Sequence, residues 1–519
     1  MKRAARISKV LCKGSFLAAA IFLVILSILV FPARPRTLMA QAGGPSMLDP
    51  KLDVRTVVTG LVTPTTMAFL GDDDFLVLEK NTGKVQRVLR GIKRDPVLSL
   101  PVNFFSERGL LGIALHPDFE DNGFVYLYWT ESNTGTVSGD PAAVPLLGNR
   151  VDRFKWNGST LTFDRNLIKL RAFQADEGQP LRGNHDGGVI VFESEREREG
   201  ERENSNHRGR RDREDEEKSK LFIIMGDNGR RGNLQNVSFG TFRDGVHDDQ
   251  FGGPEPDNAH LTGVILRLND DGTTPEDNPF FEAGDRIGGE VGANIQKIFA
   301  YGVRNSFGLA VDPLSGNLWD EENGDDSFDE INIVPPGSNN GWVQIMGPVE
   351  RIREYKAIET SPRFFGLQQI RWPPTLIADT PQEALRRLFV IRGSHYNDPQ
   401  FSWKFAVPPA AIGFVEGDAL GKEFEGDLFV GASTPLTVGG HLFRFKLTGN
   451  RRALQFQDPR LQDRVADNLD KHDITESESL LIGRDFGIGT DIKTGPNGNL
   501  FVVSLTRGAV FEIFRRERD

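Results

Sequence analysis

Short apolar runs separated by Gly, Pro, Asn and Asp turns recur from about residue 54 to residue 514. Runs such as those from Phe124 to Trp129 and from Asn499 to Ser504 are rich in Val, Leu, Phe and Tyr. This composition between turn residues is typical of short β-strands joined by tight turns. The pattern therefore predicts an all-β chain of antiparallel meanders.

One unit returns along the chain, and it consists of an apolar strand, a Pro/Gly/Asp turn, a second apolar strand and a later strand. Its imperfect copies begin at Thr66, Gly112, Gly188, Phe307, Ile412 and Asp491. Radial repetition of such sheets gives a propeller, in which neighbouring blades bury one another's faces. We predict a six-bladed β-propeller of four-stranded antiparallel sheets rather than a pair of β-sandwiches, which seldom repeat one unit so often.

The early strand from Val54 to Thr59 has no partner within the first unit. An unpaired strand edge invites aggregation, so a propeller must close its ring. We expect this strand to pair with the last sheet, built from Asn499 to Phe514.

The composition fits a globular, turn-rich protein, with 56 Gly and 29 Pro among 519 residues. A formal net charge of -11 argues against a nucleic-acid partner, because phosphate binding requires a basic face. The sole cysteine, Cys12, precedes the first apolar run. Disulfides and thiolate chemistry are therefore excluded for the remainder of the chain.

The N-terminus has the pattern of an export segment. Basic residues precede an apolar run from Phe16 to Phe31, and Ala40-Gln41-Ala42 then gives a small-x-small cleavage pattern. An uncleaved membrane anchor with its basic end inside is the alternative, because the run is near the lower limit for spanning a bilayer. We assign residues 1–42 to a signal peptide or anchor, residues 43–519 to the propeller, and an exported location to the protein.

Long insertions separate some of the units. The segment from Ser194 to Lys220 is almost devoid of apolar residues and mixes both charge signs, which predicts a disordered, solvated loop. The segments from Asn233 to His260 and from Gly347 to Phe405 mix aromatic, Pro and acidic residues. We expect these two to be ordered loops around the mouth of the propeller.

Several ordered phrases carry a family resemblance across about Val54 to Phe514. They are ERGLLGIALHPDF from Glu107, GNHDGG from Gly183, GDNG from Gly226, TGVILRLNDDGTTPEDNPF from Thr262, YGVRNSFGLAVDP from Tyr301 and DEINIVPPGSNNGW from Asp329. In this order they resemble the glucose/sorbosone dehydrogenase family, whose sugar dehydrogenases use pyrroloquinoline quinone (PQQ). The resemblance implies hydride transfer from a carbohydrate hydroxyl to the quinone.

The resemblance gives His185 the place of the family's general base. Imidazole suits that role because its ordinary pKa lies near neutrality. Arg304, a catalytic and cofactor-binding position in the family, would polarise a quinone carbonyl, and Asn305 would lie beside it at the cofactor. Glu107 stands where the family has Gln near the histidine, also on the cofactor side, and Asp227 matches a carboxylate close to the sugar.

The resemblance also implies Ca²⁺, held by backbone carbonyls at the positions of Gly324 and Asp325. The acidic stretch around them offers the hard oxygen ligands that Ca²⁺ prefers. Glu330 matches a ligand of a second, structural calcium site in some members, although Asn340 replaces their Tyr.

One part of the family pattern is missing. An Arg-x-Arg-Asp phrase that would clamp the quinone carboxylates is replaced, and Ile488 and Thr490 stand at the two arginine positions. Each lost bidentate pair forfeits about 1.5 to 3 kcal/mol of charge-assisted bonding. Arg484 is the candidate replacement, and a family Lys is also absent, at Gly431 to Thr434.

Two functions of different class follow. The first is an exported PQQ-dependent sugar dehydrogenase with altered cofactor contacts, acting on a carbohydrate substrate with an unknown electron acceptor. The second is a non-catalytic propeller that binds carbohydrate or protein. A propeller lactonase is disfavoured because no matching set of inward metal ligands aligns. Under the first function, His185, Asp227 and Arg304 must converge on one mouth of the ring.

Overall fold

The computed structural model describes residues 43–173, 184–194, 218–229, 240–241, 247–248, 261–364, 374–435 and 439–517. The predicted export segment lies outside these residues, as do most of the charged insertion and most of the loop from Asn233 to His260. Within the described part of the chain, no helix is both long and apolar enough to cross a membrane.

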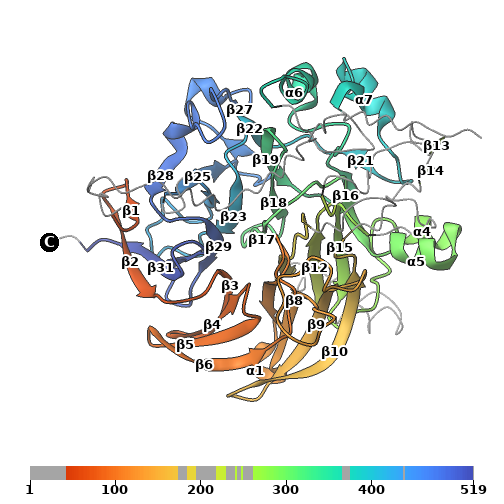
Figure 1. Cartoon of the computed structure of the whole chain (residues 1–519). Helices are drawn as coiled ribbons and strands as arrows, with labels where there is room; N and C mark the ends of the chain where they lie inside the picture. The colour runs from red at the N-terminus through yellow and green to blue at the C-terminus, as the bar shows by residue number, and fades with distance from the viewer. Residues whose placement is uncertain are drawn as a thin grey trace, which may run out of the picture. The chain divides into compact units, whose positions relative to one another are not determined.

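The prediction of an all-β propeller fold with small antiparallel sheets is confirmed. The described residues form six sheets of four or more strands and one two-stranded ribbon of β13 (Gly240–Thr241) and β14 (His247–Asp248). Each larger sheet is built around four strands in antiparallel order. Figure 1 shows these sheets arranged around a common centre, with β3, β17, β23 and β29 near it.

The first sheet holds β3 (Pro64–Gly71), β4 (Asp74–Glu79), β5 (Lys84–Leu89) and β6 (Ile92–Ser99). The second holds β7 (Leu110–Leu115), β8 (Phe124–Thr130), β9 (Asn149–Trp156) and β10 (Leu161–Leu170). The third holds β11 (Ile190–Phe192), β12 (Lys220–Met225), β15 (Val264–Asn269) and β16 (Ile298–Tyr301).

The fourth sheet holds β17 (Gly308–Val311), β18 (Leu318–Glu322), β19 (Ser327–Ile333) and β22 (Phe401–Phe405). The fifth holds β23 (Pro409–Phe414), β24 (Leu428–Ala432), β25 (His441–Leu447) and β28 (Leu481–Arg484). The sixth holds β29 (Gly489–Thr494), β30 (Leu500–Ser504), β31 (Ala509–Arg515) and β2 (Leu52–Val58).

The prediction of four strands per sheet is wrong for the third, fourth and fifth sheets. Short strands extend them: β20 (Ser338–Asn339), β21 (His395–Tyr396), β27 (Val465–Ala466), β1 (Ser46–Met47) and β26 (Leu454–Gln455). Loop segments pair here with strands that would otherwise leave backbone groups open, which shields the sheet edges.

Helices lie in the connections between strands. They are α1 (Phe119–Asn122), α4 (Phe281–Ile287), α5 (Gly289–Ile295), α6 (Ile352–Glu359) and α7 (Pro381–Arg387), with 3-10 turns at Val349–Arg351, Pro374–Leu376, Pro459–Leu461 and Ser477–Leu480. The loop predicted from Gly347 to Phe405 carries α6 and α7, so its described part is ordered. Thr380 caps α7, because its side chain accepts a hydrogen bond from the Glu383 backbone N–H.

Ring closure follows the prediction. Strand β2 pairs antiparallel with β31, with Val54 opposite Ile513 and Thr56 opposite Phe511. The first described long strand thus completes the sheet made by the end of the chain. Val58 and Val510 also join a buried cluster that this sheet shares with the first sheet.

Each of the six larger sheets packs against two others through buried apolar side chains. Inner strands such as β12, β23 and β30 are buried along their whole length. The outer strand β6 is instead mostly exposed. Strands covered on both faces read as continuous apolar runs, which explains why the repeat is visible in the sequence.

Antiparallel order fixes which loops share one end of the sheets. The start of the first strand and the turn between the second and third strands lie at the same end, which we call the mouth end.

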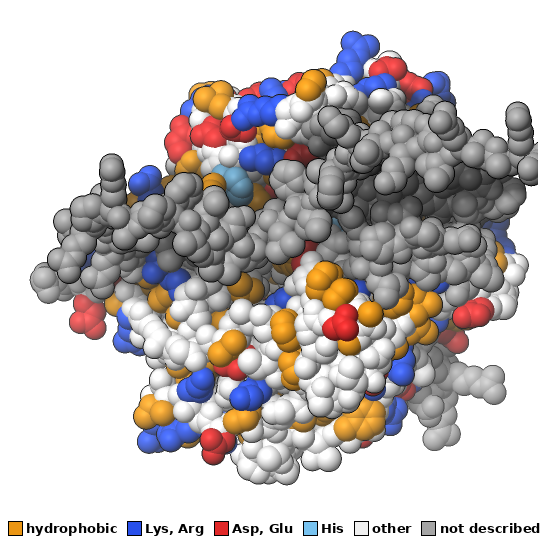
Figure 2. Space-filling model, in the orientation of Figure 1, with side chains coloured by type: hydrophobic (Ala, Val, Ile, Leu, Met, Phe, Trp, Pro, Cys, Tyr) orange, Lys and Arg blue, Asp and Glu red, His pale blue; other side chains and the backbone are white. Residues whose placement is uncertain are grey.

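On the face shown in Figure 2, basic and acidic side chains are interspersed with apolar ones over the described surface.

Candidate active site

Three predicted site residues come from mouth-end segments of neighbouring sheets. His185 precedes β11, Asp227 follows the end of β12, and Arg304 lies between β16 and β17. All three are buried, with 4%, 1% and 5% of their surface exposed. The structure brings them into one cluster.

A glycine allows this close approach. A Cβ atom at Gly226 would lie 2.4 Å from the carbonyl oxygen of His185 and 2.9 Å from that of Arg304. The Asp227 backbone N–H also donates to the Arg304 carbonyl, at 2.8 Å. His185 itself adopts a left-handed backbone conformation, with φ of 59°. Such a conformation is uncommon outside glycine and is held here by the surrounding contacts.

The imidazole of His185 is held by a carboxylate. Its Nδ1 lies 2.6 Å from Oδ1 of Asp227, whose Oδ2 accepts a hydrogen bond from Trp342 Nε1 at 2.8 Å. Burial opposes the charge on Asp227, but the charge of and hydrogen bond from His185 lower the pKa of this carboxyl below its usual value. An ionised Asp227 keeps the proton on Nδ1 and leaves Nε2 as the ring nitrogen available to a substrate.

Arg304 is aimed at the loop after β18. Its Nη1 donates to the Asn323 carbonyl at 2.7 Å, its Nη2 donates to Asp325 Oδ1 at 2.8 Å, and its Nε is buried without a partner. The guanidinium lies 5.4 Å from the centre of the Trp342 ring. Burial alone would lower the pKa of Arg304, but Asp325 and Asp227 raise it above its usual value. Arg304 is therefore a permanent positive charge beside the histidine.

Glu107, in the loop between β6 and β7, also reaches this cluster. Its Oε2 accepts from the His185 backbone N–H at 2.6 Å and from Asn305 Nδ2 at 3.2 Å. Asn305 Oδ1 is buried and has no partner. The predicted cofactor-side residues Glu107 and Asn305 therefore lie together, next to the histidine and the arginine.

The predicted metal residues separate into two places. Asp325 meets Arg304, and the Gly324 N–H donates to Asp329. Glu330 lies on β19, where its oxygens accept from the Gly347 N–H and from the Asn332 side chain. Among the described residues, no hydrogen bond or ion pair joins Glu330 to Asp325.

The place of the missing arginine clamp is lined by apolar and hydroxyl groups. The Ile488 N–H donates to Thr506 Oγ1 at 2.9 Å, and Thr490 Oγ1 donates to the Pro64 carbonyl at 3.3 Å. Arg484 lies on β28, the fourth strand of its sheet counted outward, and is exposed. It therefore does not take over the position that the inner strand β29 would have given the clamp.

Sequence reasoning missed three residues of this site. Trp342, Glu359 and Lys471 reach the cluster from loops or helices far away in the chain, through contacts with Asp227, Ser327 and Asp326. Only Trp342 had a signal, because it ends the phrase NNGW that follows the acidic loop. The other two stand in no recognisable pattern.

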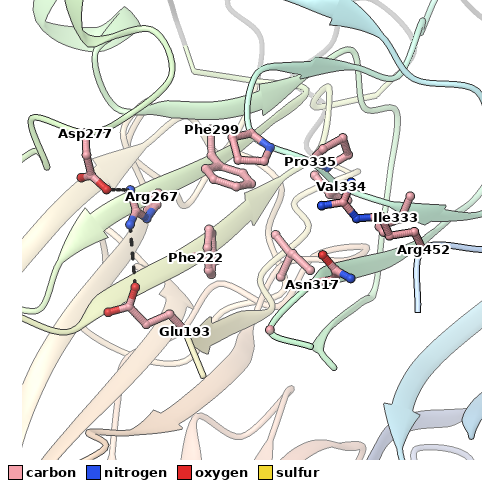
Figure 3. A pocket seen from close by; sticks show the side chains of 13 residues that line it. Glu193, Phe222, Arg267, Asp277, Phe299, Asn317, Ile333, Val334, Pro335 and Arg452 are labelled. Carbon is pink, nitrogen blue, oxygen red and sulfur yellow. Dashed lines mark hydrogen bonds and ion pairs between the residues drawn. The ribbon is translucent and has the colours of Figure 1, made fainter. Parts of the chain in front are cut away.

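A hollow lies at the end of the sheets opposite to the mouth. It has a volume of about 560 Å³ and is lined by the β17–β18 turn and by residues after β19. Figure 3 shows Phe222 and Phe299 in its middle and Arg267 at one side, paired with Asp277 and Glu193. None of its lining residues belongs to the mouth cluster.

Comparison with known proteins identifies the family of the chain. A family model described as Glucose / Sorbosone dehydrogenase matches residues 61–361. Aldose sugar dehydrogenase YliI of Escherichia coli (strain K12) is 23% identical over 455 residues, covering 87% of this chain and 90% of the relative.

Two solved structures share the fold. The soluble aldose sugar dehydrogenase from Escherichia coli in the apo-form gives a TM-score of 0.57 at 22% identity and covers 90% of this chain and all (100%) of that one. The PQQ-bound aldose sugar dehydrogenase from Streptomyces coelicolor gives a TM-score of 0.51 at 22% identity, with 90% and 99% covered.

The described residues form a propeller whose mouth unites a carboxylate-held histidine with a buried arginine. The chain belongs to the glucose/sorbosone dehydrogenase family, since the family model covers more than half of it. This membership places it among the sugar dehydrogenases.

Proposed function

We propose that the protein oxidises a carbohydrate hydroxyl by transferring hydride to a bound quinone, with His185 as general base. The observation that carries this proposal is the buried Asp227–His185 pair beside Arg304. Each of the three groups has a role in such a reaction.

His185 would move the proton. Its Nε2 accepts the hydrogen of the substrate hydroxyl while the adjacent C–H bond gives up hydride, so that a carbonyl forms and the charges balance. Asp227 stabilises the imidazolium and holds the ring in place. The quinone, when bound, supplies the hydride acceptor.

The residues fit a quinone in part. Arg304 offers a fixed positive charge with an unpaired buried Nε, and Asn305 offers an unpaired amide oxygen. Arg304 would hold the electron-rich carbonyl edge as charge develops there. The carboxylate arms of PQQ would not find an arginine pair, because Ile488 and Thr490 stand on that side. We expect weaker PQQ binding than a clamp would give.

Calcium is also proposed at this site. The carbonyls of Gly324 and Asp325 match the expected ligands, and carboxylates surround them. The Asp325 carbonyl accepts a hydrogen bond from Lys471 Nζ at 3.3 Å. A cationic group thus already lies at one of the two expected ligands.

We further propose that the six larger sheets are six blades of one ring. Six buried clusters support this, because each joins one sheet to the next: first to second, second to third, third to fourth, fourth to fifth, fifth to sixth, and sixth to first. The propeller domain would span residues 43–519. The basic and apolar N-terminal pattern supports export of the protein, or its anchoring on the outer side of the membrane. A carbohydrate is the substrate that we propose.

The test uses the purified full-length protein with PQQ and Ca²⁺, an artificial electron acceptor and a panel of aldoses. His185→Gln should lower kcat by about 10² to 10⁴ while quinone binding is retained. His395→Gln, an exposed histidine on β21, is the matched control and should change neither. Quinone binding without oxidation of any sugar by the wild type would favour the non-catalytic binding propeller.

A further inference from the structure

Three carboxylates gather beside Arg304, at the edge of the mouth cluster. Asp325 and Asp326 lie in the turn between β18 and β19, and Glu359 ends helix α6. One oxygen from each lies within 4.8 Å of those of the other two. The cluster thus combines the β18–β19 turn with a helix from a distant loop.

Two oxygens in this cluster are buried without a partner. Asp325 uses Oδ1 for Arg304, and its Oδ2 accepts nothing; only 7% of its side chain is exposed. Glu359 uses Oε1 for the Asp326 N–H and for Ser327 Oγ, and its Oε2 accepts nothing; 1% of this residue is exposed. An acceptor buried without a donor is costly, so the two oxygens indicate a missing positive partner.

The charges point the same way. Arg304 and Lys471 are the cations that pair with Asp325 and Asp326, and Glu359 is left with neutral donors only. The cluster therefore holds one carboxylate more than its cations balance.

We propose that Asp325, Asp326 and Glu359 bind a divalent cation through their carboxylates, and that Ca²⁺ is the cation they suit. Carboxylate oxygens in a flexible set are the ligands Ca²⁺ prefers, with solvent completing a shell of about six to eight. The site differs from the backbone carbonyls expected from the family, because its ligands are side chains and include Glu359. It requires no quinone.

Binding there would change Arg304. The same carboxylate that pairs with Arg304 would share its charge with the cation, so less of that charge would neutralise the guanidinium. Arg304 would then present a stronger positive field to a ligand at the mouth. The cation would thus act on the reaction site through Asp325, without touching the substrate.

The test measures Ca²⁺ binding calorimetrically to the full-length protein after chelation, with no quinone present. Ca²⁺ should bind to the wild type without quinone. Glu359→Gln should weaken binding at least about tenfold, which is about 1.4 kcal/mol. Lys471→Met should tighten it, because the competing ammonium is gone. Glu354→Gln on the same helix, whose carboxylate pairs with Arg351 at 2.7 Å, is the matched control and should bind like the wild type.

Absence of Ca²⁺ binding by the wild type at millimolar concentration overturns the proposal. Equal binding by the wild type and Glu359→Gln overturns it as well. Should Glu359→Gln fail to fold, Asp326→Asn replaces it with the same expectation, since Asp326 is only partly buried. The result is separate from the dehydrogenase assay: Ca²⁺ binding without sugar oxidation would contradict the proposed function and leave the cation site standing.

Discussion

Asp227 is the residue whose role the structure changes most. The family resemblance matched it to a carboxylate close to the sugar. In the fold, Oδ1 faces His185 and accepts from the Gly229 N–H, and Oδ2 accepts from Trp342. A carboxylate committed to these donors orients the base, and it has little capacity left for a substrate hydroxyl.

Asp227→Asn tests the two roles. Loss of the ionised acceptor allows the wrong imidazole tautomer, so kcat should fall roughly 10²-fold or more while KM changes little. Steady-state kinetics with the best aldose measures both constants. A rise in KM with unchanged kcat would instead assign Asp227 to substrate binding. Unchanged quinone affinity serves as the control for folding.

The carboxyl group of Asp186, next to His185, leads us to predict that the free energy of unfolding depends on pH. Its Oδ1 accepts from Asn149 at 2.8 Å, its Oδ2 is buried without a partner, and burial raises the pKa of this carboxyl to about 6 from 3.8. Because the pKa is higher in the folded state, the protonated Asp186 carboxyl contributes to the free energy of unfolding. This contribution is complete below pH 3.8 and is lost as the pH rises through 6.

The variant Asp186→Asn cannot ionise and should escape this loss. Two pK units correspond to about 3 kcal/mol at most, so the variant should gain about 1 to 3 kcal/mol over the wild type between pH 4 and pH 7. Urea unfolding at both pH values measures the difference. Parallel changes in the two proteins would show that Asp186 is solvated.

Among the elements, the turn that follows β12 matters most to the site. Gly226 is where the segments carrying His185 and Arg304 come closest, so Gly226→Ala should push both backbones apart. We expect a destabilisation of about 1 to 3 kcal/mol, as for other overpacked sites, together with loss of activity. Gly71→Ala at the end of β3 is the control, since a Cβ there meets nothing within 4 Å.

Elements and site residues differ in how far the sequence revealed them. Strands covered on both faces, such as β23 and β30, are apolar throughout, and Gly-flanked phrases marked His185 and Arg304. Glu359 and Lys471 could not be found in the same way. Their partners lie far away in the chain. Neither residue belongs to a sequence pattern that its own segment would show, so only the folded chain reveals their positions.

For the whole molecule, the ring depends on one pairing between the chain's two ends. A chain that begins at Gly60 lacks β2 and should leave β31 as an open edge, with apolar side chains of the closing cluster exposed. We expect a large fall in Tm or failure to fold. Of the described helices and strands, a chain that begins at Asp49 lacks only the short strand β1, and its Tm should differ little. Calorimetry compares the two, and equal Tm values would contradict the importance of closure.

This closure also sets an order of events during synthesis. Strand β2 is among the first segments of the propeller to leave the ribosome, whereas its partner β31 is among the last. The leading strand must therefore remain unpaired until synthesis is almost complete. Throughout that interval the nascent chain carries an open strand edge, which makes aggregation a hazard of its biogenesis rather than of its finished state.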